Sequence, residues 1–183
     1  MKVKDVVLSA ANVLGIKKGV AAYFNGESTE LEREAELLLN CFNNVESSLA
    51  FDYLPLYAED TVRTATGILE FSELTYSPVR VVSVADDLGN AASFEIFPKY
   101  LRLEPGRYRL TYTYAPNLKT IDGESDYGTL SCNSLLVYGV LSEYCLAEGR
   151  YPDADAWDKK YKRAIESTYQ MGRGTVLSSR RWV

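Results

Sequence analysis

A chain of 183 residues, of which 46% are hydrophobic and 25% charged, is long enough to bury a sizeable core, and we expect one soluble domain. Its formal net charge of −5 argues against a whole surface devoted to nucleic-acid binding. The chain has no histidine, which removes the usual general base, the Ser-His and Cys-His nucleophile systems and the common zinc ligand sets.

The three cysteines predict buried, reduced thiols in a protein made in the cytosol, because their number is odd and their spacing wide. They are Cys41, Cys132 and Cys145, and they contain no CxxC pair. No apolar run approaches the length of a transmembrane helix, so no membrane partner is expected. Residues 1–15 faintly resemble a signal peptide, but the helical spacing of their apolar residues indicates a helix of the mature protein.

The N-terminal part of the chain is predicted to be helical. Apolar residues at helical spacing predict a first helix that Gly15 ends, and a short helical piece over residues 19–24. The strongest helix is predicted over residues 29–53, where apolar residues recur at steps of three and four. These residues are Leu31, Ala35, Leu38, Phe42, Val45 and Leu49.

The middle of the chain is predicted to be a β region. Residues 53–67 contain a proline and show no period, so we expect a connector that crosses to a different structural layer. From 67 to 114, short runs rich in β-branched and aromatic residues alternate with turn sequences. We expect a small antiparallel sheet of four or five strands, over residues 68–71, 79–84, 93–97, 101–103 and 108–114.

The last of these strands carries an alternating ladder of tyrosines. Tyr108, Tyr112 and Tyr114 point to one side together with Leu110. This face is predicted either to pack against helices or to form an interface, and the sequence leaves both open.

Two further helices are predicted after a polar loop over residues 115–128. The helix over 129–148 is apolar almost all round, so it lies either at the centre of the domain or against another subunit. Within it, Gly139 would let a neighbouring element come close. The last helix covers residues 153–171.

The predicted fold class is therefore α+β: a helical bundle of about four main helices with an inserted small antiparallel β-sheet and an extended C-terminal arm. Residues 1–171 are expected to form a single domain, with helical parts 1–53 and 129–171 and a β insert over 67–114. Residues 172–183 form the arm.

A loop with alternating carboxylates is the sharpest metal-like pattern. Asp122, Glu124 and Asp126 have a spacing that lets oxygens converge on calcium. The loop lacks the later bidentate glutamate of an EF-hand, and the alternative is a solvated turn. We predict no metal site and no cofactor.

Two acidic pairs are candidates for acid and base catalysts, namely Glu59-Asp60 and Asp86-Asp87. Both occur in a context typical of turns, and the spacing of the carboxylates in space does not follow from sequence. We therefore predict that the chain has no catalytic residue and is not an enzyme.

The C-terminal segment is the most unusual part of the sequence, since it is basic, lacks acidic side chains and still contains large apolar residues. Ordering such a segment costs about 1–2 kcal/mol per residue, and burying one large apolar side chain returns about 1.5–3 kcal/mol. One copy would bind weakly, whereas many copies on one ring-shaped partner would bind firmly. The residues predicted to dock on a partner are Arg173, Val176, Leu177, Arg180, Arg181, Trp182 and Val183.

The order of these elements resembles that of the head-to-tail adaptor (connector) proteins of tailed bacteriophages. The similar segments are DVVLSAANVLG, the predicted helix over 29–53 that leads into LPLY, RLTYTYAP, and LLVYGVLSEYCLAEGRYPDADAWDKKYKRAIE. The resemblance spans nearly the whole chain, and its motifs are packing patterns rather than chemistry.

The resemblance implies a non-enzymatic virion protein of the neck region, made in the host bacterial cytoplasm. It implies a homo-oligomeric ring of about twelve copies whose C-terminal arms bind the portal protein while the β region faces a tail or nozzle protein. DNA would pass through the ring without sequence-specific binding. The residues implied in subunit packing are Leu136, Tyr138, Gly139, Val140, Tyr144, Trp157 and Tyr161.

Three other functions stay open at this point. The first is a neck or tail-completion protein that does not contact the portal. The second is a carbohydrate- or ligand-binding module that uses the tyrosine face, and the third is a small hydrolase that uses acidic residues.

Overall fold

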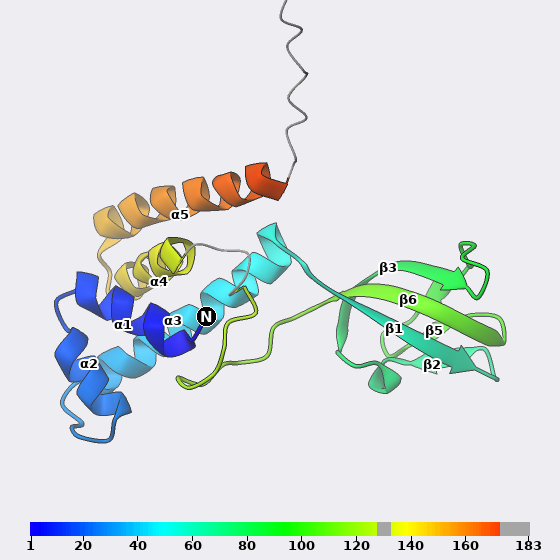
Figure 1. The fold of residues 1–183 in the computed structure, drawn as a ribbon, viewed down its shortest axis with the longest axis horizontal. Helices are drawn as coiled ribbons and strands as arrows, with labels where there is room; N and C mark the ends of the chain where they lie inside the picture. The colour runs from blue at the N-terminus through cyan, green and yellow to red at the C-terminus, as the bar shows by residue number, and fades with distance from the viewer. Residues whose placement is uncertain (128–132, 173–183) are drawn as a thin grey trace, which may run out of the picture. The chain divides into compact units, whose positions relative to one another are not determined.

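The computed structural model describes residues 1–127 and 133–172 (Figure 1). Within them the chain is mixed α+β, with five α-helices and two small antiparallel sheets, which confirms the α+β class. The chain divides into two compact units. We call them the helical unit, residues 1–46 and 118–183, and the β unit, residues 47–117.

The helical unit is built from segments at both ends of the sequence. Its helices are α1 (Val3–Val13), α2 (Lys17–Phe24), α3 (Glu32–Ser48), α4 (Asn133–Ala147) and α5 (Tyr151–Gly172). Helix α4 packs along α5 and against α1, while α2 packs against α1. The helix predicted over 29–53 is α-helical from Glu32 to Ser48, and then continues as a π-helical turn, η1 (Leu49–Tyr53).

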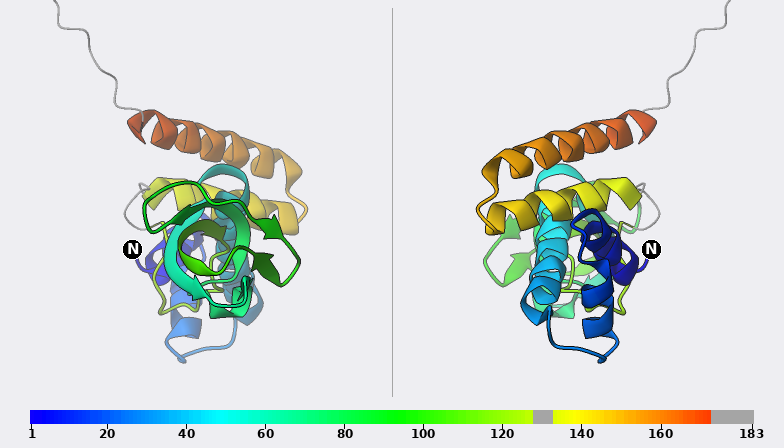
Figure 2. Two further views of the ribbon diagram at one scale, coloured as in Figure 1. Left: turned by 90° about the vertical axis from the view of Figure 1, so that its right-hand side faces the viewer. Right: turned by 90° about the vertical axis from the view of Figure 1, so that its left-hand side faces the viewer.

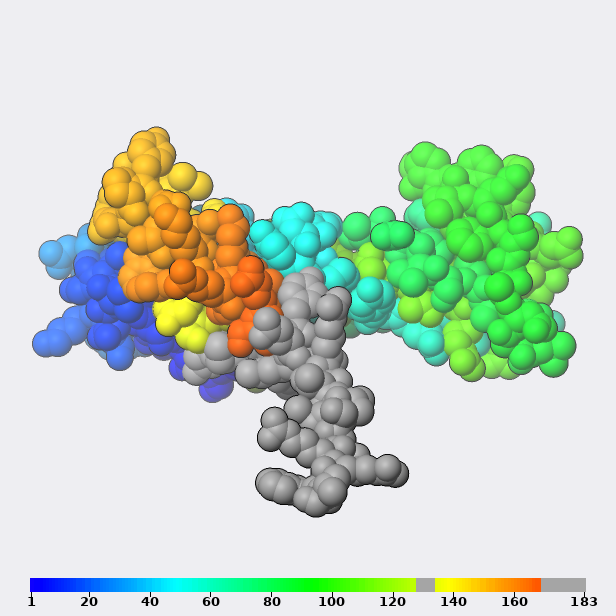
Figure 3. Space-filling model, turned by 90° about the horizontal axis from the view of Figure 1, so that it is seen from above, coloured from blue at the N-terminus to red at the C-terminus, as the bar shows by residue number. Residues whose placement is uncertain are grey.

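Helix α4 is the centre of the helical unit, as the sequence allowed. Seven of its residues are no more than 8% exposed: Leu135, Leu136, Val137, Val140, Leu141, Tyr144 and Cys145. A Cβ built on Gly139 would lie 2.8 Å from Val45 Cγ1 and 3.0 Å from Tyr161 Cε2. Side chains of α3 and α5 therefore close on this glycine from two sides, and in a space-filling view α5 (orange) covers most of α4 (yellow; Figure 3).

The β unit consists of two three-stranded antiparallel sheets. The larger has the order β1 (Leu56–Thr64), β6 (Gly106–Tyr114), β3 (Pro78–Asp86), and the smaller has the order β2 (Ile68–Glu70), β5 (Tyr100–Arg102), β4 (Glu95–Ile96). Seen from the side of Figure 2 (left), the strands wrap around one another. Their shared core contains Leu69, Leu74, Val84, Leu101, Leu103, Tyr108, Leu110 and Tyr112.

Two predictions about the β region were wrong. Residues 53–67 are not a connector, because β1 occupies Leu56–Thr64 and alternates between partly buried and exposed residues. Pro55 precedes this strand and so removes none of its ladder hydrogen bonds. The single sheet of four or five strands is replaced by two sheets, and the β region begins at Leu56 rather than at residue 67.

The tyrosine ladder packs inside the β unit instead of against helices. Tyr108 and Tyr112 are 8% and 0% exposed and belong to the core shared by the two sheets. Tyr114 stacks on Tyr76 with ring centroids 4.1 Å apart. The buried side of this ladder therefore offers no open face to a sugar or other ligand.

Candidate functional site

The predicted partner-binding arm lies outside the described residues. This applies to Arg173, Val176, Leu177, Arg180, Arg181, Trp182 and Val183. Helix α5 runs to Gly172, immediately before this segment. Docking by the arm stays a prediction.

Most residues implied in subunit packing serve the core of their own chain. Leu136, Gly139, Val140, Tyr144 and Tyr161 are all buried within this single chain. Their burial needs no second subunit, because α3, α4 and α5 already cover them.

The other two residues of that set form a partly exposed aromatic pair. The rings of Tyr138 and Trp157 stack with centroids 5.8 Å apart. The Lys160 Nζ lies 3.9 Å from the centroid of the Trp157 ring, a cation–π contact. Together these three side chains give α4 and α5 an amphipathic surface patch suited to a protein contact.

Helix α3 holds the loop over residues 118–127 through two polar side chains that face the interior. The Asn43 side-chain carbonyl accepts from the Lys119 N–H at 2.7 Å, and its amide donates to the Lys119 carbonyl at 3.1 Å. Glu46 Oε1 accepts from the Ser125 hydroxyl at 2.5 Å and from the Asp126 N–H at 3.1 Å. Sequence reasoning missed both side chains because they lie on the apolar face of an otherwise regular helix.

Glu46 is a buried carboxyl group in which one of the two oxygens accepts hydrogen bonds from described residues and the other does not. The residue is 1% exposed, and Oε2 has no hydrogen-bond partner among the residues that the structure describes. Burial raises the pKa of Glu46, and the hydrogen bond from Ser125 opposes this rise only in part.

The loop with alternating carboxylates is fastened to the N-terminus. The Val3 N–H donates to the Gly123 carbonyl at 3.0 Å, and the Ser125 N–H donates to the Met1 carbonyl at 2.9 Å. The Asp126 carboxylate pairs with Lys119 Nζ at 2.9 Å. Over residues 1–127 and 133–172, no group of three or more His, Cys, Asp or Glu side chains is arranged to hold a metal ion. These contacts indicate that the loop stabilises the N-terminus of the chain.

The Glu59-Asp60 pair is split by its strand. Neighbouring residues of β1 point to opposite faces, so Glu59 lies on the exposed face and Asp60 on the partly buried one. Asp60 accepts hydrogen bonds from the Thr75 N–H, the Thr75 hydroxyl and the Tyr112 hydroxyl at 2.7–2.8 Å. Burial acts to raise the pKa of Asp60, but these hydrogen bonds outweigh it and hold that pKa below its ordinary value.

The Asp86-Asp87 pair is split in a similar way. Asp86 accepts from the N–H groups of Leu88 and Asn90 and closes the turn after β3. The hydrogen bonds from Asn90 lower the pKa of Asp86. Asp87 lies 3.8 Å from the Arg107 guanidinium. Asp86 and Asp87 both line a hollow of about 190 Å³, together with Arg107 and Arg109.

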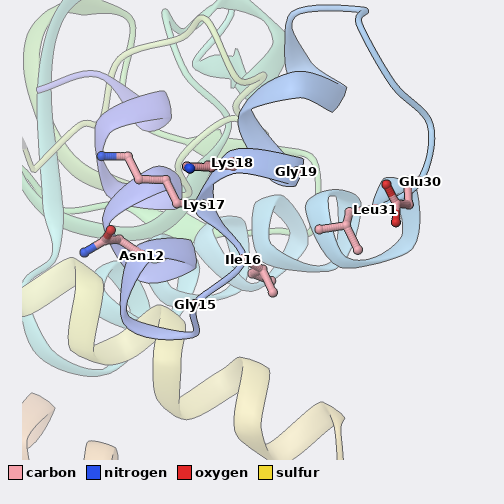
Figure 4. A pocket seen from close by; sticks show the side chains of 8 residues that line it. All are labelled: Asn12, Gly15, Ile16, Lys17, Lys18, Gly19, Glu30 and Leu31. Atoms are coloured by element: carbon pink, nitrogen blue, oxygen red, sulfur yellow. The ribbon is translucent and has the colours of Figure 1, made fainter.

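A pocket of about 650 Å³ opens between the α1–α2 turn and the start of α3 (Figure 4). Ile16 and Leu31 give it apolar walls. Lys17 and Lys18 lie on one side and Glu30 on the other, so its polar groups do not converge. Small-molecule sites combine apolar walls with a few convergent polar groups, and this pocket supplies only the first.

The outer face of the larger sheet carries a second feature that sequence reasoning missed. At one end, exposed apolar residues surround Arg80 in a groove of about 330 Å³. Its exposed apolar residues are Phe51, Tyr57, Val79 and Val82. At the other end the face carries arginines. The alternation in LYAEDTVRT was the signal that could have revealed this strand and its outward side chains.

None of the helices in the described ranges is both long enough and apolar enough to span a bilayer. Comparison with protein-family models finds no match for this sequence, and a search of curated proteins also finds none. The resemblance to head-to-tail adaptors therefore rests on the sequence segments and element order alone, and the function that it implies is a proposal.

Proposed function

We propose that this chain is a structural protein of the virion neck, a head-to-tail adaptor that forms a ring between the portal and the tail. The observation that carries the proposal is the order of its elements. Three N-terminal helices are followed by a β unit, two further helices and a basic segment, which is the order that the adaptor resemblance implies. The chain acts as a mechanical spacer through which DNA passes.

In this proposal the helical unit is a bundle that holds the ring together. Helix α4 provides its rigid centre, as the close approach of Val45 and Tyr161 to Gly139 supports. The stacked Tyr138 and Trp157 are the residues of the packing set that remain available to a neighbouring copy. Residues 173–183 bind the portal, and the β unit faces the tail or nozzle protein.

The arrangement of carboxylates supports a role without chemistry. Asp60 accepts hydrogen bonds from Thr75 and Tyr112, and Asp86 accepts one from the Leu88 N–H of its own turn. Asp126 forms an ion pair with Lys119. The tyrosines on the inner side of β6 are buried, which removes the basis for a sugar-binding face. Adaptor function needs neither a reactive group nor a ligand cleft.

Truncation of the arm tests the proposal. The chain ending at residue 172 should keep the melting temperature of the full chain but lose binding to portal, measured by co-sedimentation. A matched full-length variant, Lys159→Gln, Lys162→Gln and Arg163→Gln, removes three exposed positive charges of α5, as many as the truncation removes, and should still bind.

Full portal binding by the truncated chain would refute the role of the arm. Binding of the intact chain to tail protein but never to portal would assign it to the neck or tail-completion class. Glycan binding without portal binding would assign it to a ligand-binding module.

A further inference from the structure

The outer face of the larger sheet brings three arginines together. In the antiparallel register of β1 and β6, Arg63 stands directly opposite Arg107, and Thr61 stands opposite Arg109. Directly opposed residues of a sheet point to the same side. All four residues are exposed, and we call them the arginine face.

This juxtaposition works against folding. Like charges directly opposite each other on neighbouring strands repel, and they are normally avoided. Compensation is partial: Arg109 Nε lies 3.4 Å from Glu59 Oε1, and Arg107 Nε lies 3.8 Å from Asp87 Oδ1. Arg63 makes no ion pair within the described ranges. A chain with net charge −5 thus gathers three arginines on one small surface, two of them beside carboxylates and Arg63 without an ion pair within the described ranges.

The surroundings of the arginines are polar. Thr111 and Ser83 stand opposite each other beside them, and they add hydroxyl groups to that of Thr61. A hollow of about 190 Å³ is lined by Thr61, Arg107 and Arg109, and also by the carboxylates of Asp86 and Asp87. The exposed apolar residues of this sheet, Tyr57, Val79 and Val82, gather at its other end.

Arginine and short hydroxyl side chains are the groups that contact phosphates and sugars of nucleic acids. A protein partner would instead require an apolar centre to its interface, and the arginine face has none.

We propose that the arginine face binds the phosphate backbone of nucleic acid without reading its sequence. The inference rests on the sheet alone and holds whether or not the chain forms a ring; within the proposed adaptor it would give passing DNA a weak, salt-sensitive contact.

The test measures binding of a fluorescent 30-base-pair duplex to the full chain by anisotropy at several salt concentrations. Three phosphate contacts predict a slope of log affinity against log salt of about −2.7, or about a 40-fold loss between about 50 and 200 mM salt. The variant Arg63→Gln/Arg107→Gln/Arg109→Gln should lose this component and flatten the slope toward zero. Its melting temperature should change little, because the substitution removes both the repulsion between outward-facing arginines and two exposed ion pairs.

A control variant removes the same charge elsewhere: Arg33→Gln, Arg102→Gln and Arg163→Gln, all exposed and outside the arginine face. It should bind the duplex like the wild type. Equal losses in both triple variants would overturn the proposal in favour of a general charge effect. No binding by the wild type at about 50 mM salt, or tighter binding of poly-glutamate than of duplex, would also overturn it. Ring assembly, measured by native mass on the same samples, reports separately on the adaptor proposal.

Discussion

Substitution of Gly139 by alanine tests whether α4 is wedged between α3 and α5. The new methyl group would lie 2.8 and 3.0 Å from the two Cγ atoms of Val45 and 3.0 Å from Tyr161 Cε2. Val45 is β-branched and sits on a helix, so it is confined to one strongly preferred rotamer and yields little. Alanine gains about 1 kcal/mol of helix propensity, while over-packing costs about 1–3 kcal/mol. We expect Gly139→Ala to destabilise by up to about 2 kcal/mol.

The matched variant, Val45→Ala, removes the side-chain atoms that lie closest to Gly139. Val45→Ala alone should cost about 2–3 kcal/mol through lost burial and a cavity. If the new methyl group fills part of that cavity, the double variant is more stable than the sum of the single effects by about 1–2 kcal/mol. The remaining close contact, with Tyr161, sets the upper limit of this rescue.

The assay is urea unfolding followed by tryptophan fluorescence. The chain has two tryptophans, Trp157 and Trp182, and Trp157 lies in α5. In a Trp182→Phe background the signal therefore reports the helical unit alone, which matters because two units need not unfold together. Additive effects of the two substitutions, or stabilisation by Gly139→Ala in both backgrounds, would refute the wedge.

Three other predictions concern buried polar and thiol groups. Tyr112→Phe removes the donor to Asp60 and the acceptor of the Tyr76 N–H, and it should destabilise the β unit by about 1–3 kcal/mol in urea unfolding followed by circular dichroism; an unchanged midpoint would contradict this. Glu46→Gln tests the raised pKa of Glu46. A carboxyl whose pKa is higher in the folded than in the unfolded protein favours the folded state in its protonated form, fully below the unfolded-state pKa of about 4.3. The wild type loses this stabilisation as pH rises through the folded-state pKa. The melting temperature of the variant minus that of the wild type should therefore increase between about pH 4 and pH 7. A difference that stays constant over this range would contradict a raised pKa of Glu46. Burial raises the pKa of Cys41 to about 12, so iodoacetamide at about pH 8 should label this thiol slowly in the native protein and rapidly in urea, as peptide mass spectrometry can measure.

The helices followed from sequence because their signal is local. The steps of three and four from Leu31 to Leu49 define one face of α3, and most of these residues are buried as expected. The apolar centre of α4 was equally clear, although sequence could not decide between a core and a subunit interface. Whether α4 lies in the core or at a subunit interface depends on its contacts with Val45 of α3 and Tyr161 of α5, and a local sequence pattern does not reveal contacts between helices.

The features that sequence could not give depend on strand register and long-range pairing. Strand β1 was missed because Pro55 and two acidic residues obscured its alternation. The opposition of Arg63 and Arg107 exists only once that strand pairs with β6. In the same way, the hydrogen bond from Ser125 to Glu46 joins positions 79 residues apart.

The adaptor role itself is tested most directly by electron cryomicroscopy of the virion neck. The account predicts a closed ring of copies of this chain immediately beneath the portal, with residues 173–183 lying against portal subunits. A reconstruction that places the chain elsewhere in the particle, or that shows a neck without it, would contradict the proposed function.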